Sequence, residues 1–71
     1  MMIEPDTTYD MVLKYARKNR TFTRFDLIKD LKVSYHVASH IPELLVRDGY
    51  LRISIGKYRN LDVNLYMYKI D

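Results

Sequence analysis

The stretch that decides the fold is "KVSYHVASHIPELLVRDGY", residues 32–50. Ser34 is a residue type that caps the start of helices, and Gly49 is the type most often found just past a helix end. The apolar residues between them recur at the spacing of one helical face: Val37, Ile41, Leu44 and Leu45. The stretch therefore predicts a helix that begins after Ser34 and ends at Asp48 and Gly49.

Pro42 lies in the middle of this predicted helix. Proline has no N–H to donate to the carbonyl four residues earlier, here that of Ala38, and its ring crowds that carbonyl, at a cost of about 3 kcal/mol. The unbroken apolar spacing favours a single helix that bends near residues 38–42. The alternative is a helix that stops at His40, followed by a second helix with Pro42 at its first position.

Two further helices are predicted upstream. Residues 7–19 carry a possible capping box, Thr7 with Asp10, ahead of one apolar stripe: Tyr9, Val12, Leu13 and Ala16. The cations of the opposite face are those of an ordinary solvated helix surface: Lys14, Arg17 and Lys18.

The segment that follows, residues 20–23, breaks the helical pattern and suits a very short strand. Thr23 then caps the next helix, with Asp26 three residues later, and this helix is expected to end near Leu31. Its buried stripe is predicted to be Phe25, Ile28 and Leu31, helped by Leu27.

After Gly49 the apolar period changes from about 3.6 residues to about 2, which predicts two strands. The first has one apolar face: Leu51, Ile53 and Ile55. The second has another: Leu61, Val63, Leu65 and Met67. Tyr66 and Tyr68 alternate with this second set, and we expect them in a cross-strand aromatic cluster or a dimer contact. Residues 56–60 form the predicted hairpin tip, and the order of elements is α-β-α-α-β-β.

The composition limits the class of protein. A chain of 71 residues is expected to form a single domain, residues 1–71, with a small core. It has no cysteine, which excludes disulfides and thiolate metal sites. No apolar run approaches the roughly 20 residues of a membrane span, and residues 1–10 lack the features of a signal peptide. We therefore expect an intracellular, cytoplasmic protein, and the net charge of +3 weakly favours an anionic partner.

No catalytic or metal site is predicted. His36, His40 and Glu43 have a spacing that can bind zinc on a helix, but the chain has no cysteine and no other histidine to complete such a site. There is no nucleophile–base pair, glycine-rich phosphate loop or carboxylate cluster in the sequence. We expect neither enzyme activity, nor a cofactor, nor a small-molecule substrate.

With these elements in this order, the sequence resembles winged helix-turn-helix domains. The resemblance covers residues 21–67 and is carried by Phe22-Thr23, Asp26-Leu27, Leu31, Val33-Ser34, Val37, Ile41, Leu44-Leu45 and Gly49-Tyr50-Leu51. It implies an α+β fold of three helices, a short strand and a C-terminal β-hairpin wing. Two residues depart from the pattern. The first is Lys32, which stands where the turn between the last two helices often has Gly, at a cost of roughly 1 kcal/mol if φ is positive there. The second is Pro42.

The resemblance further implies that the third helix binds in the major groove of double-stranded DNA while the wing contacts the minor groove or the backbone. The outward residues of the first half of that helix are Tyr35, His36, Ser39 and His40. The wing would use Lys57, Tyr58 and Arg59, joined by Arg52. The DNA backbone would be held near the starts of the second and third helices by Arg20, Thr21, Thr23, Arg24 and Ser34.

Each group also has an explanation without DNA. The helix residues can form an ordinary solvated face, the wing residues can be a solubilising hairpin end, and Thr23 and Ser34 can serve only as helix caps. The favoured hypothesis is a transcriptional regulator that binds DNA with full or partial sequence specificity, acts by occupying its operator, and forms a homodimer on a two-fold site. Small, cysteine-free proteins rich in Tyr and Ile resemble those of archaeal viruses and plasmids. The alternative is a winged-helix module that binds protein and not DNA.

Overall fold

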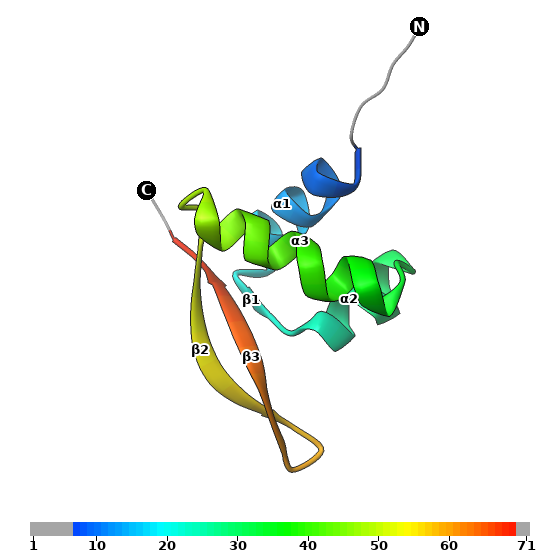
Figure 1. The fold of residues 1–71 in the computed structure, drawn as a ribbon, viewed down its shortest axis with the longest axis vertical. Helices are drawn as coiled ribbons and strands as arrows, with labels where there is room; N and C mark the ends of the chain where they lie inside the picture. The colour runs from blue at the N-terminus through cyan, green and yellow to red at the C-terminus, as the bar shows by residue number, and fades with distance from the viewer. Residues whose placement is uncertain (1–6, 70–71) are drawn as a thin grey trace, which may run out of the picture.

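The computed structural model describes residues 7–69. The elements are α1 (Thr7–Asn19), β1 (Thr21–Phe22), α2 (Arg24–Leu31), α3 (Tyr35–Arg47), β2 (Leu51–Tyr58) and β3 (Leu61–Tyr68). This confirms the predicted α+β order, and the arrangement is winged-helix-like (Figure 1). The capping box predicted at Thr7 involves a side chain outside the described part of the chain.

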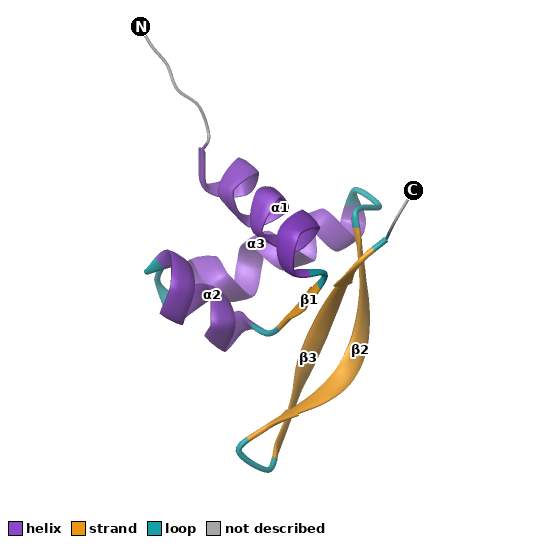
Figure 2. Cartoon of the chain, turned by 180° about the vertical axis from the view of Figure 1, so that it is seen from behind, coloured by secondary structure: helices purple, strands orange, loops and turns teal. Residues whose placement is uncertain are grey.

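The strands form one antiparallel sheet in the order β1-β3-β2. Phe22 of β1 pairs with Tyr66 near the end of β3, whereas β2 pairs with β3 along its whole length, from Leu51 opposite Tyr68 to Tyr58 opposite Leu61. The helices gather around the base of this hairpin. Its tip extends beyond them and curves toward the side on which α2 lies (Figures 1 and 2).

Every element contributes to the core. The residues that are at most 2% exposed are Val12 and Ala16 of α1, Phe22 of β1, Leu27 of α2, Ala38, Pro42 and Leu45 of α3, Leu51 of β2 and Tyr66 of β3. The aromatic cluster expected for Tyr66 is present, since its ring stacks on Phe22 with centroids 5.6 Å apart. Tyr15 meets the same Phe22 ring edge-on at 5.6 Å.

The hairpin corrects the prediction for the strands. Residues paired across antiparallel strands share a face, so Ile53 lies beside Tyr66, and the two predicted apolar faces lie on opposite sides of the hairpin. At the base of the hairpin the core uses the tyrosine face of β3, because Tyr66 buries its ring and directs its hydroxyl to Glu43. On the predicted face, Val63 is buried at 7% exposure. Ile53, Ile55 and Leu61 are 41%, 67% and 65% exposed.

The buried stripes of α2 and α3 also differ from the prediction. In α2, Leu27 is buried and Ile28 and Leu31 pack against the core as predicted, but Phe25 does not belong to the core cluster. In α3, the buried residues are Ala38, Pro42 and Leu45. Leu45 is buried as predicted, whereas the rest of the predicted stripe, Val37, Ile41 and Leu44, is only partly buried. The helix is therefore rotated by a fraction of a turn relative to the prediction.

Pro42 lies inside one continuous helix. The single-helix prediction is thus confirmed, and the alternative of two short helices is wrong. The ring of Pro42 is buried among the core side chains, so apolar burial offsets part of the hydrogen bond that its missing N–H costs. The bend near residues 38–42 stays a prediction.

The turns match their predicted caps, with one correction. The N–H of Thr23 donates to Asp26 Oδ2 at 2.9 Å, and Ser34 Oγ accepts from the N–H of Val37 at 3.1 Å. Lys32 does adopt positive φ, at 60°.

The hairpin tip is shorter than predicted, because the strands extend to a two-residue turn, Arg59 and Asn60, with φ of 52° and 69°. Positive φ at both residues is the geometry of a type I′ turn.

Candidate nucleic-acid interface

The start of α3 presents three of its four predicted DNA-contacting side chains to solvent. Tyr35 is 57% exposed, and His36 and His40 are exposed as well. The two imidazole rings, one helical turn apart, stack with centroids 5.8 Å apart and planes inclined by 10°. They form a continuous ring surface with donors and acceptors at its edge.

Ser39 is a correction to the predicted set. Its Oγ is buried and hydrogen-bonds to no described residue. The reason is the rotation of α3: with Ala38 and Pro42 in the buried stripe, Ser39 lies at the edge of that stripe, where its hydroxyl is covered. Ser39 therefore does not belong to the exposed face of the helix.

Arg24, predicted to hold the DNA backbone, instead lies against α3. It is the first residue of α2 and half-buried, and its Nη1 donates to the hydroxyl of Tyr35 at 2.7 Å. Its guanidinium also lies 5.5 Å from the centroid of the Tyr35 ring and 5.7 Å from that of Phe25. Because Arg24 occupies an acceptor lone pair of the phenol, the phenol proton of Tyr35 remains free to be donated to an acceptor on a ligand.

The wing tip is joined to α2 through aromatic rings. Tyr58, at the end of β2, stacks on Phe25 with centroids 4.4 Å apart and an interplanar angle of 17°. Phe25 in turn meets Tyr35 at 6.5 Å, and the guanidinium of Arg59 lies 5.7 Å from the centroid of Tyr58. We call the resulting set Arg59, Tyr58, Phe25, Tyr35 and Arg24 the aromatic row. Sequence reasoning placed Phe25 in the core and missed this contact.

The other wing cations are exposed. Lys57 forms an ion pair with Asp62 across the hairpin at 2.5 Å, and both side chains are more than two-thirds exposed. Exposed pairs of this kind contribute about 0–1 kcal/mol, so Lys57 is available to exchange its partner for a stronger anion. Arg52 is exposed nearer the base of β2.

The other residues predicted to contact the DNA backbone lie in two places, at the starts of α2 and α3 and beside the base of the hairpin. Thr23 is 7% exposed, so it serves as a helix cap and presents little surface to DNA. Ser34 is exposed while it caps α3. Arg20 and Thr21 are exposed beside the base of the hairpin, where Thr21 pairs with Met67 and Arg20 lies over the Tyr68 ring at 5.6 Å. The structure therefore does not bring Arg20 and Thr21 together with the wing tip.

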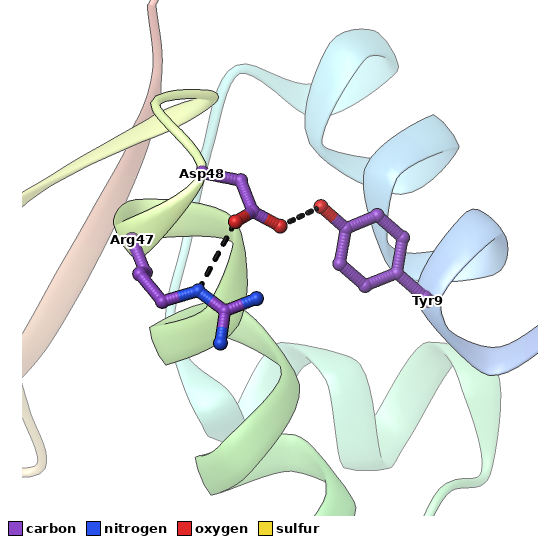
Figure 3. A network of polar contacts seen from close by, with 3 residues as sticks. All are labelled: Tyr9, Arg47 and Asp48. Atoms are coloured by element: carbon purple, nitrogen blue, oxygen red, sulfur yellow. Dashed lines mark hydrogen bonds and ion pairs between the residues drawn. The ribbon is translucent and has the colours of Figure 1, made fainter.

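The far end of α3 is fixed by a polar network (Figure 3). The hydroxyl of Tyr9 donates to Asp48 Oδ2 at 2.6 Å, and Nε of Arg47 donates to Asp48 Oδ1 at 3.1 Å. The hydrogen bond to Asp48 raises the pKa of Tyr9 to about 12. The same hydrogen bond, followed by that from Arg47, lowers the pKa of Asp48. The network ties α1 to the C-terminal end of α3, at the opposite end from Tyr35.

Residues 7–69 contain neither a membrane-spanning helix nor a cluster of metal-binding side chains. No helix there has the length and apolar character needed to cross a bilayer. No three His, Asp or Glu side chains of this part of the chain are grouped in a way that holds a metal ion.

Known proteins resemble this chain in fold and not in sequence. No protein-family model matches it, and no curated protein matches it. Among solved structures it is similar to Stf76 from the Sulfolobus islandicus plasmid-virus pSSVx, with a TM-score of 0.76 over 93% of this chain and 86% of that one. The sequence identity is 12%, so the likeness shows a shared fold.

Proposed function

We propose that this protein binds double-stranded DNA and regulates transcription by occupying its binding site. The observation that carries the proposal is the aromatic row, which joins the exposed start of α3 to the basic wing tip. A helix start and a cationic hairpin tip held side by side match the two contacts of a winged helix, one in a major groove and one on the adjacent minor groove or backbone.

In this binding mode Tyr35, His36 and His40 approach base edges. Tyr35 donates its phenol proton, because Arg24 already occupies one of its lone pairs. None of these residues is Arg, Asn or Gln, the types that form bidentate base contacts, and Ser39 is turned away. Base discrimination is therefore modest, and phosphate contacts and wing insertion supply most of the affinity.

The likeness to Stf76 supports an origin in a virus or plasmid, together with the small size and the absence of cysteine. A chain with one recognition helix gains operator affinity by forming a homodimer, since two half-sites are then bound at once. Selection of bound fragments from random duplex DNA tests this part. A palindromic product is expected, and a product without two-fold symmetry would contradict the homodimer.

The salt dependence of duplex binding tests the proposal directly. Log affinity should fall linearly with log salt concentration, with a slope of about −0.9 for each phosphate contact. We expect Lys57→Ala combined with Arg59→Ala to reduce that slope by roughly 1 to 2. Lys14→Ala on the exposed outer face of α1 is the matched control and should leave it unchanged.

A second function, binding to a protein partner, is favoured by the exposed apolar side chains of the hairpin. Ile53 and Ile55 are large, apolar and exposed on one face of β2, as expected for a surface that a protein covers. Absence of duplex binding at about 50 mM salt would contradict the DNA proposal and favour this alternative.

A further inference from the structure

The wing tip contacts the helices through a side chain of α2. At the last pair of the hairpin, Tyr58 lies opposite Leu61, which is 65% exposed. Tyr58 is nevertheless half-buried, because the ring of Phe25 lies on it at 4.4 Å. The hairpin enters the core at its base, through Leu51 and Tyr66, and Val63, opposite Gly56, is also buried at 7% exposure. The stack of Phe25 on Tyr58 is a further point of attachment, at the last residue of β2.

Phe25 has a position that suits this role better than a role in folding. It is the second residue of α2 and lies outside the core cluster, whereas the core contacts of α2 are made by Leu27, Ile28 and Leu31. Its ring is shared between the wing, through Tyr58, and α3, through Tyr35. The near-parallel arrangement of Phe25 and Tyr58 at an angle of 17° is a favourable stacking geometry.

The row also fixes Tyr35. Arg24 donates to the Tyr35 hydroxyl and covers the ring, while Nε of Arg24 is buried without a hydrogen-bond partner among the described residues. A guanidinium that leaves one donor unsatisfied is held by its other contacts, here the phenol and two aromatic faces. Parts of β2, α2 and α3 are thus connected by direct contacts.

We infer that Phe25 is a positioning residue for DNA binding, which holds the wing tip at a fixed place relative to the start of α3. The inference rests on the proposed function. A two-stranded ribbon attached only at its base must lose its bending freedom when it meets DNA, and that loss weakens binding. With the stack in place, Arg59 and Tyr35 reach the duplex already ordered relative to each other.

The test replaces Phe25 by Leu, which keeps an apolar side chain at a half-buried site. In the free protein, the backbone amides of residues 57–62 should show lower heteronuclear ¹⁵N NOE values, and duplex affinity should fall by about two- to tenfold. Phe25→Tyr, which keeps the ring, should restore both. Ile55→Thr is the control, because Ile55 lies on the same hairpin but outside the row and is 67% exposed.

A double-mutant cycle separates positioning from a merely structural role. Arg59→Ala should reduce affinity less in the Phe25→Leu background than in the parent, because an unattached wing gains less from its Arg. Equal losses in both backgrounds, or unchanged NOE values in Phe25→Leu, would overturn the inference. If Phe25→Leu does not fold, Tyr58→Thr removes the same stack from the other side and is judged by the same criteria.

The two proposals fail in different ways. If the parent protein does not bind duplex DNA, the proposed function is overturned, and with it the role of Phe25 in DNA binding. The NOE measurement needs no DNA, so it still decides whether Phe25 fixes the wing. If the parent binds DNA and the NOE values or the coupling do not change, the inference alone is overturned.

Discussion

Four positions with left-handed backbone conformation in the described part of the chain are occupied by charged or polar residues, although glycine would be the least strained choice there. The non-glycine residues with positive φ are Arg20, Lys32, Arg59 and Asn60, within residues 7–69. A non-glycine residue in this region costs about 1–2 kcal/mol, except that Asn tolerates it better. Such a cost persists in a structure when the side chain has a use, and for Arg59 the proposed use is contact with DNA.

Replacing Arg59 by Gly should therefore affect binding and spare folding. Relief of the left-handed strain, about 1–2 kcal/mol, is offset by loss of the contact with Tyr58, up to about 1 kcal/mol, and by the greater freedom of unfolded Gly, about 0.4–1 kcal/mol. We expect the free energy of unfolding to stay within about 1 kcal/mol of the parent while duplex affinity falls. Asn60→Gly, in the same turn, is the control for binding. Chemical denaturation measures the stability, and a loss above about 2 kcal/mol would mean that Arg59 is structural.

At the scale of elements, the sequence allowed most boundaries to be predicted, because caps and turns depend on residues within about four positions of one another. The bounds of α1 and the caps at Thr23 and Ser34 are examples. Which face of an element is buried depends on what packs against it. Pro42, which is predicted to bend α3, lies buried in the core. Phe25, which is predicted to lie in the core, instead stacks on Tyr58 of the wing.

Pro42→Ala tests how the helix tolerates its proline. Alanine restores an N–H for the carbonyl of Ala38 and favours the helix by about 3 kcal/mol. It also removes about two buried methylenes, which costs near 1.6 kcal/mol, and it increases the conformational entropy of the unfolded chain, which lowers stability by about 0.4–1 kcal/mol. These effects nearly cancel, so the free energy of unfolding should change by less than about 1 kcal/mol. A gain of about 3 kcal/mol would instead mean that the buried ring contributes nothing.

At the scale of the whole molecule, tyrosine–carboxylate hydrogen bonds join elements that are distant in sequence. Tyr9 bonds to Asp48 across 39 residues, Tyr15 to Asp30 across 15, and Tyr66 to Glu43 across 23. These pairings could not be predicted, because tyrosine is consistent with either face of a helix or strand and its partner is set only by the assembled fold. The aromatic row escaped prediction for the same reason. A small core makes such bonds at its edge more important for fixing the helices.

The bond between Tyr9 and Asp48 makes stability depend on pH at both extremes. The pKa of Tyr9 is raised from 10.0 to about 12 in the folded protein, so its contribution is present below pH 10.0 and is lost as the pH rises toward 12. The pKa of Asp48 is lowered from 3.8, so its contribution is present above pH 3.8 and is lost as the pH falls through the lower folded value. Thermal unfolding of the parent and of Tyr9→Phe should therefore differ most between these limits, with the variant less stable, and the two should converge above pH 10.0. A constant difference between parent and Tyr9→Phe up to pH 12 would show that the ring, and not its hydrogen bond, fixes α1 to the end of α3.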